Sequence, residues 1–141
     1  MTEREKTLTV TALSPSGEGL AEHNGRWIKL QDSLPGERVK VLGEGRSLRV
    51  VARENDSTDR ARPQCPIVSA CGGCAWQHAS QSLQQRTRLE HLVRALPGEL
   101  RSLPIESTVS PMAYGYRTRA RMAWRVERGR TTLGFHARGA A

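Results

Sequence analysis

Short runs of alternating hydrophobic and polar residues fill the first third of the chain. In TLTVTAL (residues 7–13), Leu8, Val10 and Ala12 share one face and threonines occupy the other. The runs RWIKL, RVKVL and SLRVVARE continue the pattern, separated by segments such as SPSGEG and LPGE that favour turns. Short strands at this spacing predict a small closed or half-closed β-barrel, of a kind that binds oligonucleotides on its outer face.

The pattern changes to helical spacing in SQSLQQRTRLEHLVRAL (residues 80–96), which predicts an amphipathic helix. Ser82 with Gln85 fits a capping box at its start, and Ser80 is an equally good N-cap. Pro97-Gly98 ends the helix. The expected hydrophobic stripe, extended at its start by Leu83 and Arg86, contains Leu89, Leu92, Val93 and Leu96.

A second period-two pattern, YRTRARMAWRV (residues 116–126), predicts a strand that ERGR and TTLGF complete as a hairpin. Its arginines would repel one another unless an anion lies across them. The alternative is a solvated edge, where charge discourages strand-to-strand aggregation. We favour a nucleic-acid partner, because one face is almost purely arginine. That face carries Arg117, Arg119, Arg121 and Arg125.

Composition argues against one large core, because only 37% of the 141 residues are hydrophobic and few are aromatic. The fold expected is mainly β with one α-helix. A small OB-like barrel would occupy residues 1–55, a cysteine motif with the helix residues 56–100, and a β-hairpin region residues 101–141. The polar segment ENDSTDRARPQ supports a boundary near residues 55–62.

The net charge of +8 comes mostly from arginine, which supplies 19 of the 22 basic residues. Arginine matches phosphate and guanine geometry, so RNA or DNA is the expected partner, although a GC-rich genome would also favour arginine. Residues 101–141 contain eight basic and two acidic residues, a concentration that codon bias does not explain. Weaker RNA-binding candidates lie on the barrel: Arg26, Lys29, Arg38 and Lys40.

The tryptophan and histidine side chains lead to separate expectations. Three tryptophans are candidates for stacking on bases, but core positions are the stronger expectation for them. Three of the histidines show no partner in the sequence and are expected at the surface. These residues are Trp27, Trp76 and Trp124, and His23, His91 and His136.

All three cysteines lie within ten residues, in the spacing C-x5-C-x2-C. The N-terminus does not look like a signal peptide and no run is long enough for a membrane span, so a cytoplasmic protein without a membrane partner is expected. In that reducing compartment, metal ligation is more plausible than a disulfide. Zinc would use Cys65, Cys71, Cys74 and His78, whereas a 4Fe–4S cluster would need a fourth thiolate from elsewhere.

The segment RPQCPIVSACGGCAWQHASQSLQQR (residues 62–86) resembles the iron–sulfur motif of bacterial RNA (uracil-5-)methyltransferases, in the branch that methylates large-subunit ribosomal RNA. LSPSGEGLAEHNGRWIKLQDSLPGERVKVLG, before it, resembles a TRAM domain, which is a small OB-like barrel. YRTRARMAWRV with LGFHARG resembles the start of that family's central RNA-binding domain. The resemblance therefore covers nearly the whole chain.

The resemblance implies that Cys65, Cys71 and Cys74 are three of four ligands of a 4Fe–4S cluster, with the fourth cysteine after residue 141. It also implies an S-adenosylmethionine-binding catalytic domain that these 141 residues lack. The function expected is thus the RNA-binding N-terminal portion of a methyltransferase for 23S-type ribosomal RNA, without the catalytic domain, in a monomeric protein.

The residues also allow two alternatives. One is a stand-alone RNA-binding module that holds zinc through the three cysteines and His78. The other is a TRAM-bearing radical methylthiotransferase. Those enzymes use a C-x3-C-x2-C spacing, and Cys65 is too far from Cys71 in the sequence to match it.

Overall fold

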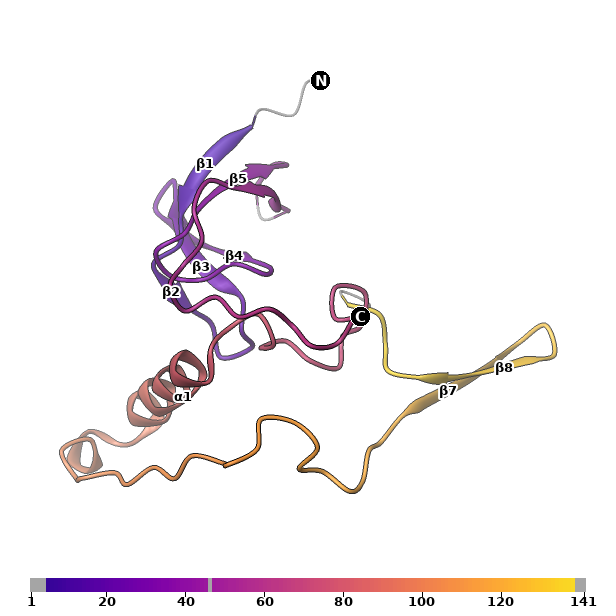
Figure 1. Ribbon diagram of the computed structural model, residues 1–141. Helices are drawn as coiled ribbons and strands as arrows, with labels where there is room; N and C mark the ends of the chain where they lie inside the picture. The colour runs from indigo at the N-terminus through magenta and orange to yellow at the C-terminus, as the bar shows by residue number, and fades with distance from the viewer. Residues whose placement is uncertain (1–4, 46, 139–141) are drawn as a thin grey trace.

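A computed structural model describes residues 5–45 and 47–138. It confirms a mainly β fold with one helix (Figure 1). A short 3-10 turn, Gly98–Leu100, follows the helix. The elements in chain order are β1 Lys6–Thr9, β2 Ala12–Leu13, β3 Gly19–His23, β4 Arg26–Leu30, β5 Arg38–Leu42, β6 Arg49–Arg53, α1 Gln81–Ala95, β7 Ala123–Glu127 and β8 Arg130–Gly134.

Two three-stranded antiparallel sheets, β1-β5-β6 and β2-β3-β4, form the barrel. The run expected as one strand at residues 7–13 is divided between them, since Val10 N–H donates to Glu37 O and Thr11 N–H donates to Leu20 O. The change of sheet also shifts the alternation, so that Leu13 is buried. The barrel core contains Leu8, Val10, Ala21, Ile28, Leu30, Val39, Val41 and Leu48.

Strand β3 has no clear signal in the sequence. Its inward positions are Gly19 and Ala21, both buried, and neither looks hydrophobic enough to mark a strand. A Cβ atom on Gly19 would overlap Ser33 Oγ and lie 2.8 Å from Val10 Cγ1. Ser33 and Val10 approach so closely that position 19 requires glycine. Because glycine is not hydrophobic, the alternating pattern that would predict this strand is missing from the sequence.

Helix α1 begins after Ser80, whose Oγ accepts from Leu83 N–H at 3.1 Å, so Ser80 is the N-cap. Leu83 and Thr87 are the buried residues of the helix. One turn later, His91 Nε2 lies 3.0 Å from Leu13 O. The expected stripe is therefore wrong toward the C-terminal end, where Leu92 is 49% exposed. His91, expected at the surface without a partner, is half-buried and has the Leu13 carbonyl oxygen as a partner.

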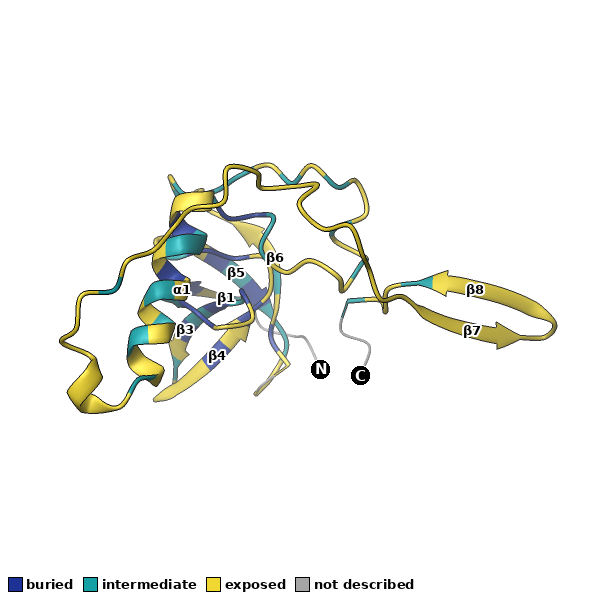
Figure 2. Cartoon of the chain, turned by 90° about the horizontal axis from the view of Figure 1, so that it is seen from below, coloured by how far each residue is buried: buried dark blue, intermediate teal, exposed yellow. Residues whose placement is uncertain are grey.

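The C-terminal arm, defined here as residues 101–138, is almost entirely exposed (Figure 2). Its strands β7 and β8 pair only with each other, with Ala123 opposite Gly134 and Glu127 opposite Arg130. The strand expected from residue 116 therefore begins only at Ala123. Because β8 has five residues, it offers no partner to residues 116–122.

The barrel and the helix share a second hydrophobic cluster. Leu13 and Leu34 of the barrel pack with Ala79 and Leu83, and half-buried Trp76 lies against them. This cluster positions the segment that carries the cysteines. In the part of the chain that the structure describes, no helix has the length and apolar character to cross a membrane.

Candidate nucleic-acid interface and cysteine loop

The cysteines lie on a loop, residues 61–77, whose two ends meet beside the barrel. Arg60 forms an antiparallel bridge with Ala79, and Ala61 N–H donates to His78 O at 2.9 Å. Ser80 N–H donates to Asp59 O at 2.8 Å, which joins this closure to the start of α1. The sequence between these contacts, called the cysteine loop below, is therefore held at both ends.

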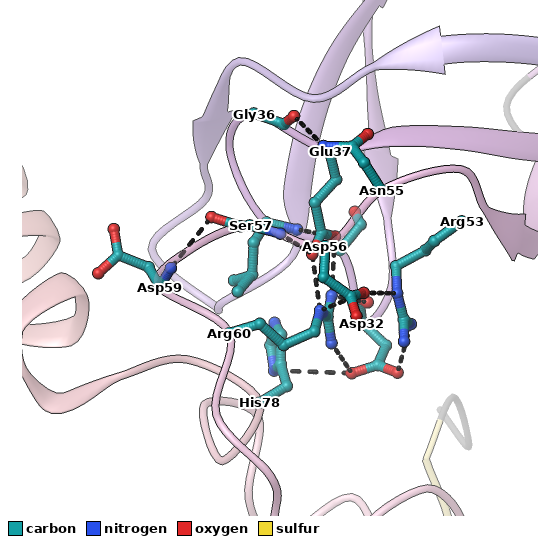
Figure 3. Close-up of polar contacts among 12 residues, drawn as sticks. Asp32, Gly36, Glu37, Arg53, Asn55, Asp56, Ser57, Asp59, Arg60 and His78 are labelled. Atoms are coloured by element: carbon teal, nitrogen blue, oxygen red, sulfur yellow. Dashed lines mark hydrogen bonds and ion pairs between the residues drawn. The ribbon is translucent and has the colours of Figure 1, made fainter.

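A buried ion pair fastens the closure to the barrel (Figure 3). The Glu37 side chain is fully buried, and its carboxylate accepts from Arg60 Nε at 2.6 Å and from the second guanidinium nitrogen at 2.8 Å. It also accepts from the N–H groups of Leu34 and Ser57. Burial alone would raise the pKa of Glu37, but these donors more than offset it and the pKa is lowered.

The sequence does not predict this pair, because LPGE is typical of a turn. Glu37 ends that turn, with its N–H donating to Leu34 O at 3.1 Å, and points inward. A charged residue next to Pro-Gly is ordinarily a solvated turn position. Nothing in the local pattern indicates that Arg60, far along the chain, supplies its partner.

His78 lies on the barrel side of the loop closure. It is buried, and Nδ1 lies 3.9 Å from Asp32 Oδ1, as Figure 3 shows. Nε2 is buried without a hydrogen-bond partner among the described residues. Burial lowers the pKa of His78, partly opposed by the Asp32 carboxylate, so the neutral imidazole is favoured.

The C-terminal arm returns to the cysteine loop. Gly72 N–H donates to His136 O at 2.9 Å, and Arg138 N–H donates to Ala70 O at 2.8 Å. The Arg138 guanidinium also donates to Cys74 O at 3.0 Å. The Gly-Gly pair permits this approach, since a Cβ on Gly72 would lie 3.0 Å from His136 O. The end of the C-terminal arm thus contacts the cysteine loop, although the two segments are far apart in the sequence.

The three cysteines are free thiols, with Cys65 and Cys71 half-buried and Cys74 exposed. Gly73 N–H donates to Cys71 Sγ at 3.4 Å, a contact that also stabilises metal-bound thiolates. The chemistry of these donors suits iron–sulfur or zinc. Their geometry does not supply a finished site, because residues 5–45 and 47–138 contain no group of three His, Cys, Asp or Glu side chains arranged to hold a metal ion.

The barrel's candidate RNA-binding cations mostly have acidic partners. Lys29 Nζ lies 3.7 Å from Glu18, the Arg38 guanidinium lies 3.2 Å from Glu54, and Lys40 Nζ lies 2.9 Å from Glu5. The hydrogen bond and charge of Glu5 raise the pKa of Lys40. Arg26 is exposed at the start of β4. A phosphate would therefore have to compete with carboxylates at three of these four positions.

Fewer of the candidate arginines in the arm have acidic partners than the candidate cations of the barrel. Arg117 lies over the Tyr116 ring at 5.7 Å, and Arg125 lies 2.7 Å from Glu127. Arg119 and Arg121 have no acidic partner among the residues that the structure describes. Only Arg125 is on strand β7, so the structure does not align the four on one strand face.

Two of the tryptophans contradict the expectation that they belong to the core. Trp27 on β4 is 62% exposed and Trp124 on β7 is 71% exposed. Trp76 is half-buried, with the Arg88 guanidinium 5.6 Å from its ring centroid. Both exposed rings are on strands whose outer face lacks a covering element, which the alternation of the sequence cannot show.

Comparison with known proteins identifies the barrel. Residues 1–42 match the family model of the TRAM domain. The chain carries a TRAM domain. The match covers strands β1 to β5 of the barrel described above, and the predicted boundary of this domain at residue 55 remains a prediction.

Relatives extend the similarity beyond the TRAM domain. A protein named 23S rRNA (uracil(1939)-C(5))-methyltransferase RlmD from Enterobacter sp. (strain 638) is 38% identical over 140 residues, which is 96% of this chain and 31% of the relative. The protein of the same name from Pectobacterium carotovorum subsp. carotovorum (strain PC1) is 36% identical, over 92% of this chain and 30% of the relative.

A third relative of that name, from Cronobacter sakazakii (strain ATCC BAA-894), is 38% identical over 83% of this chain and 27% of its own length. The chain thus spans about a third of the length of the curated relatives that it matches. These matches confirm the resemblance to the N-terminal part of the RNA (uracil-5-)methyltransferases, with the TRAM domain in the expected place.

Proposed function

We propose that this chain is the RNA-binding N-terminal portion of an S-adenosylmethionine-dependent methyltransferase that modifies a uracil C5 in large-subunit ribosomal RNA. The observation that carries the proposal is the similarity to RlmD proteins over 96% of the chain, together with the TRAM domain. In this proposal the TRAM domain and the C-terminal arm hold RNA. Methyl transfer would belong to a catalytic domain of the whole protein.

RNA contacts would be made mainly by Arg117, Arg119, Arg121 and Arg125. Their guanidinium groups can bind phosphate oxygens with two hydrogen bonds each. The barrel cations Arg26, Lys29, Arg38 and Lys40 would contribute less, because three of them are already paired with carboxylates. Ribosomal RNA, a monomeric state and a cytoplasmic location are parts of the same proposal.

Salt dependence of RNA binding tests this proposal. Replacing the four arm arginines by alanine removes four phosphate contacts, so the slope of log affinity against log salt should fall in magnitude by about 3 for single-stranded RNA. Fluorescence anisotropy with a labelled single-stranded oligouridine measures it. A quadruple lysine variant keeps the charge and should keep most of the slope. An unchanged slope in the alanine variant would mean that these arginines are only a solvated edge.

Cys65, Cys71 and Cys74 would hold a 4Fe–4S cluster together with a ligand from outside these 141 residues. The cluster would hold the modules at residues 1–55, 56–100 and 101–141 together. Its role would be structural, because methyl transfer to a pyrimidine carbon is not a redox reaction. The contact of residues 136–138 with the cysteine loop supports this, since it already joins two of the modules.

Zinc is the competing metal, and His78 distinguishes the two. His78 lies beside Asp32 and Arg60, so a zinc site would need its imidazole to turn from the barrel. Iron, sulfide and zinc should be measured in anaerobically purified protein, with Cys71→Ser and His78→Ala as variants. Iron and sulfide lost only in Cys71→Ser support the cluster, whereas one equivalent of zinc lost in His78→Ala supports the alternative. Protein free of both metals would contradict each.

A further inference from the structure

Two hairpins in this chain turn in the same way but with different residues. The β3–β4 hairpin turns through Asn24 and Gly25, with φ of 53° and 71°. The β7–β8 hairpin turns through Arg128 and Gly129, with φ of 49° and 74°. A two-residue turn of this type needs positive φ at both positions, where Asn, Asp and Gly are favoured. Arg128 therefore occupies a left-handed position that its side chain does not favour.

The tip of the β7–β8 hairpin carries an excess of positive charge. Arg128 is in the turn, and Arg130 follows it, directly opposite Glu127. Glu127 pairs with Arg125 at 2.7 Å, and neither tip arginine has an ion pair within the described part of the chain. The hairpin tip thus carries two exposed arginines, one in the turn and one at the start of β8, without an ion pair among the described residues.

The hairpin also places this charge where a large ligand can reach it. Figure 1 shows β7 and β8 extending away from the barrel and α1, and in Figure 2 both strands are coloured as exposed up to the turn, apart from the end of β8. A Cβ on Gly129 would meet no atom within 4 Å, so the turn has open space around it. Among residues 5–45 and 47–138, no atom close to Gly129 screens the turn from a polyanion.

We propose that Arg128 and Arg130 form a phosphate-binding point at the hairpin tip, separate from the four arm arginines inferred from the sequence. The inference rests on the proposed RNA binding and adds a surface to it. An unpaired cation held in an unfavourable backbone conformation is expected where its position serves a ligand. The ligand here is the phosphate backbone of RNA, because guanidinium groups bind phosphate oxygens through charge-assisted hydrogen bonds.

The double variant Arg128→Asn with Arg130→Thr tests the proposal. Asn suits the turn, as it does at residue 24, so the hairpin should form at least as well while both charges are lost. For a labelled single-stranded oligouridine, the salt slope should fall in magnitude by about 1.4 relative to the unaltered chain. Arg128→Lys with Arg130→Lys should keep the slope. The matched control Asn24→Gly alters the equivalent barrel turn without a charge and should also keep it.

The outcomes separate this inference from the function on which it rests. If the unaltered chain binds RNA and the four-arginine alanine variant loses slope but the tip variant does not, the tip is a solvated end and the inference is overturned alone. If the unaltered chain binds no RNA, both are overturned. A fall in slope for the tip variant, with the lysine variant and the Asn24→Gly control unchanged, supports it.

Discussion

The barrel and the C-terminal arm differ in the burial of their hydrophobic residues and in the ion pairing of their charged residues. The barrel buries eight hydrophobic side chains in one cluster, and Lys29, Arg38 and Lys40 on its surface lie beside carboxylates. The arm leaves large hydrophobic residues exposed, among them Trp124 at 71% and Leu133 at 70%. Several of its arginines have no acidic partner among the described residues.

This difference suggests that the barrel contributes mainly to the stability of the fold and the arm mainly to ligand binding. A closed hydrophobic core and internally paired charges stabilise a fold but leave little to attract a polyanion. An isolated two-stranded hairpin is only marginally stable in water, and its unpaired cations are available to a ligand. We therefore expect substitutions in the barrel to change the free energy of unfolding, and substitutions in the arm to change binding.

The largest expected effect is at the buried ion pair that joins the barrel to the cysteine loop. Glu37→Ala takes from Arg60, whose side chain is only 13% exposed, the one buried carboxylate that it contacts among the described residues, and leaves it the exposed and more distant Asp56 and Asp32 at 3.7 and 3.8 Å. The free energy of unfolding should fall by about 3–5 kcal/mol, measured by urea denaturation. Glu54→Ala, which removes the partner of exposed Arg38, is the control and should cost roughly 0–1 kcal/mol. Equal losses in the two variants would contradict the role of burial.

A matched pair of leucine substitutions makes the comparison directly. Leu30, fully buried in the barrel, should lose about 2–5 kcal/mol of unfolding free energy on replacement by alanine, because a cavity remains. Leu133→Ala in the arm, at a side chain that is 70% exposed, should change it by about 0.5 kcal/mol or less. A large loss for Leu133 would show that the arm contributes to the same cooperative unit as the barrel.

The smallest expected effect is a pH dependence from His78. Its pKa in the folded state is lowered from 6.5, chiefly by burial, so below that pH the unfolded chain binds a proton that the folded chain resists. The stabilising contribution is present above pH 6.5 and is lost as the pH falls through the folded value. Urea denaturation at a series of pH values should show this loss in the unaltered chain and less of it in His78→Gln. Identical profiles would contradict the burial argument.

Several elements could be predicted from the sequence because local patterns determine them. Strands β4 and β5 have the predicted bounds, since each alternates between buried and exposed positions on a sheet with one covered face. The helix lies where its spacing and Pro97-Gly98 placed it. The choice between Ser80 and Ser82 as N-cap needed the structure, because both offer a hydroxyl near the same N–H groups.

The candidate site was less predictable, since its contacts join distant residues. The cysteine spacing and the arginine-rich composition are visible in the sequence, and so is the resemblance that they carry. The Glu37–Arg60 pair, the position of His78 beside Asp32 and the return of residues 136–138 to the cysteine loop are not. The alternation of residues 116–126 also predicts a longer strand than the structure has, because a strand forms only where a second strand lies beside it.

The sequence by itself determined the barrel's hydrophobic alternation, the helix and its end, the cysteine cluster and the excess of arginine, because each depends on neighbours a few positions apart. Tertiary structure alone decided which charges are neutralised and which stay unpaired. It also decided that Gly19 must be small and that Trp27 and Trp124 are exposed. The physical reason is that burial and ion pairing depend on residues that the fold brings together from separate parts of the chain.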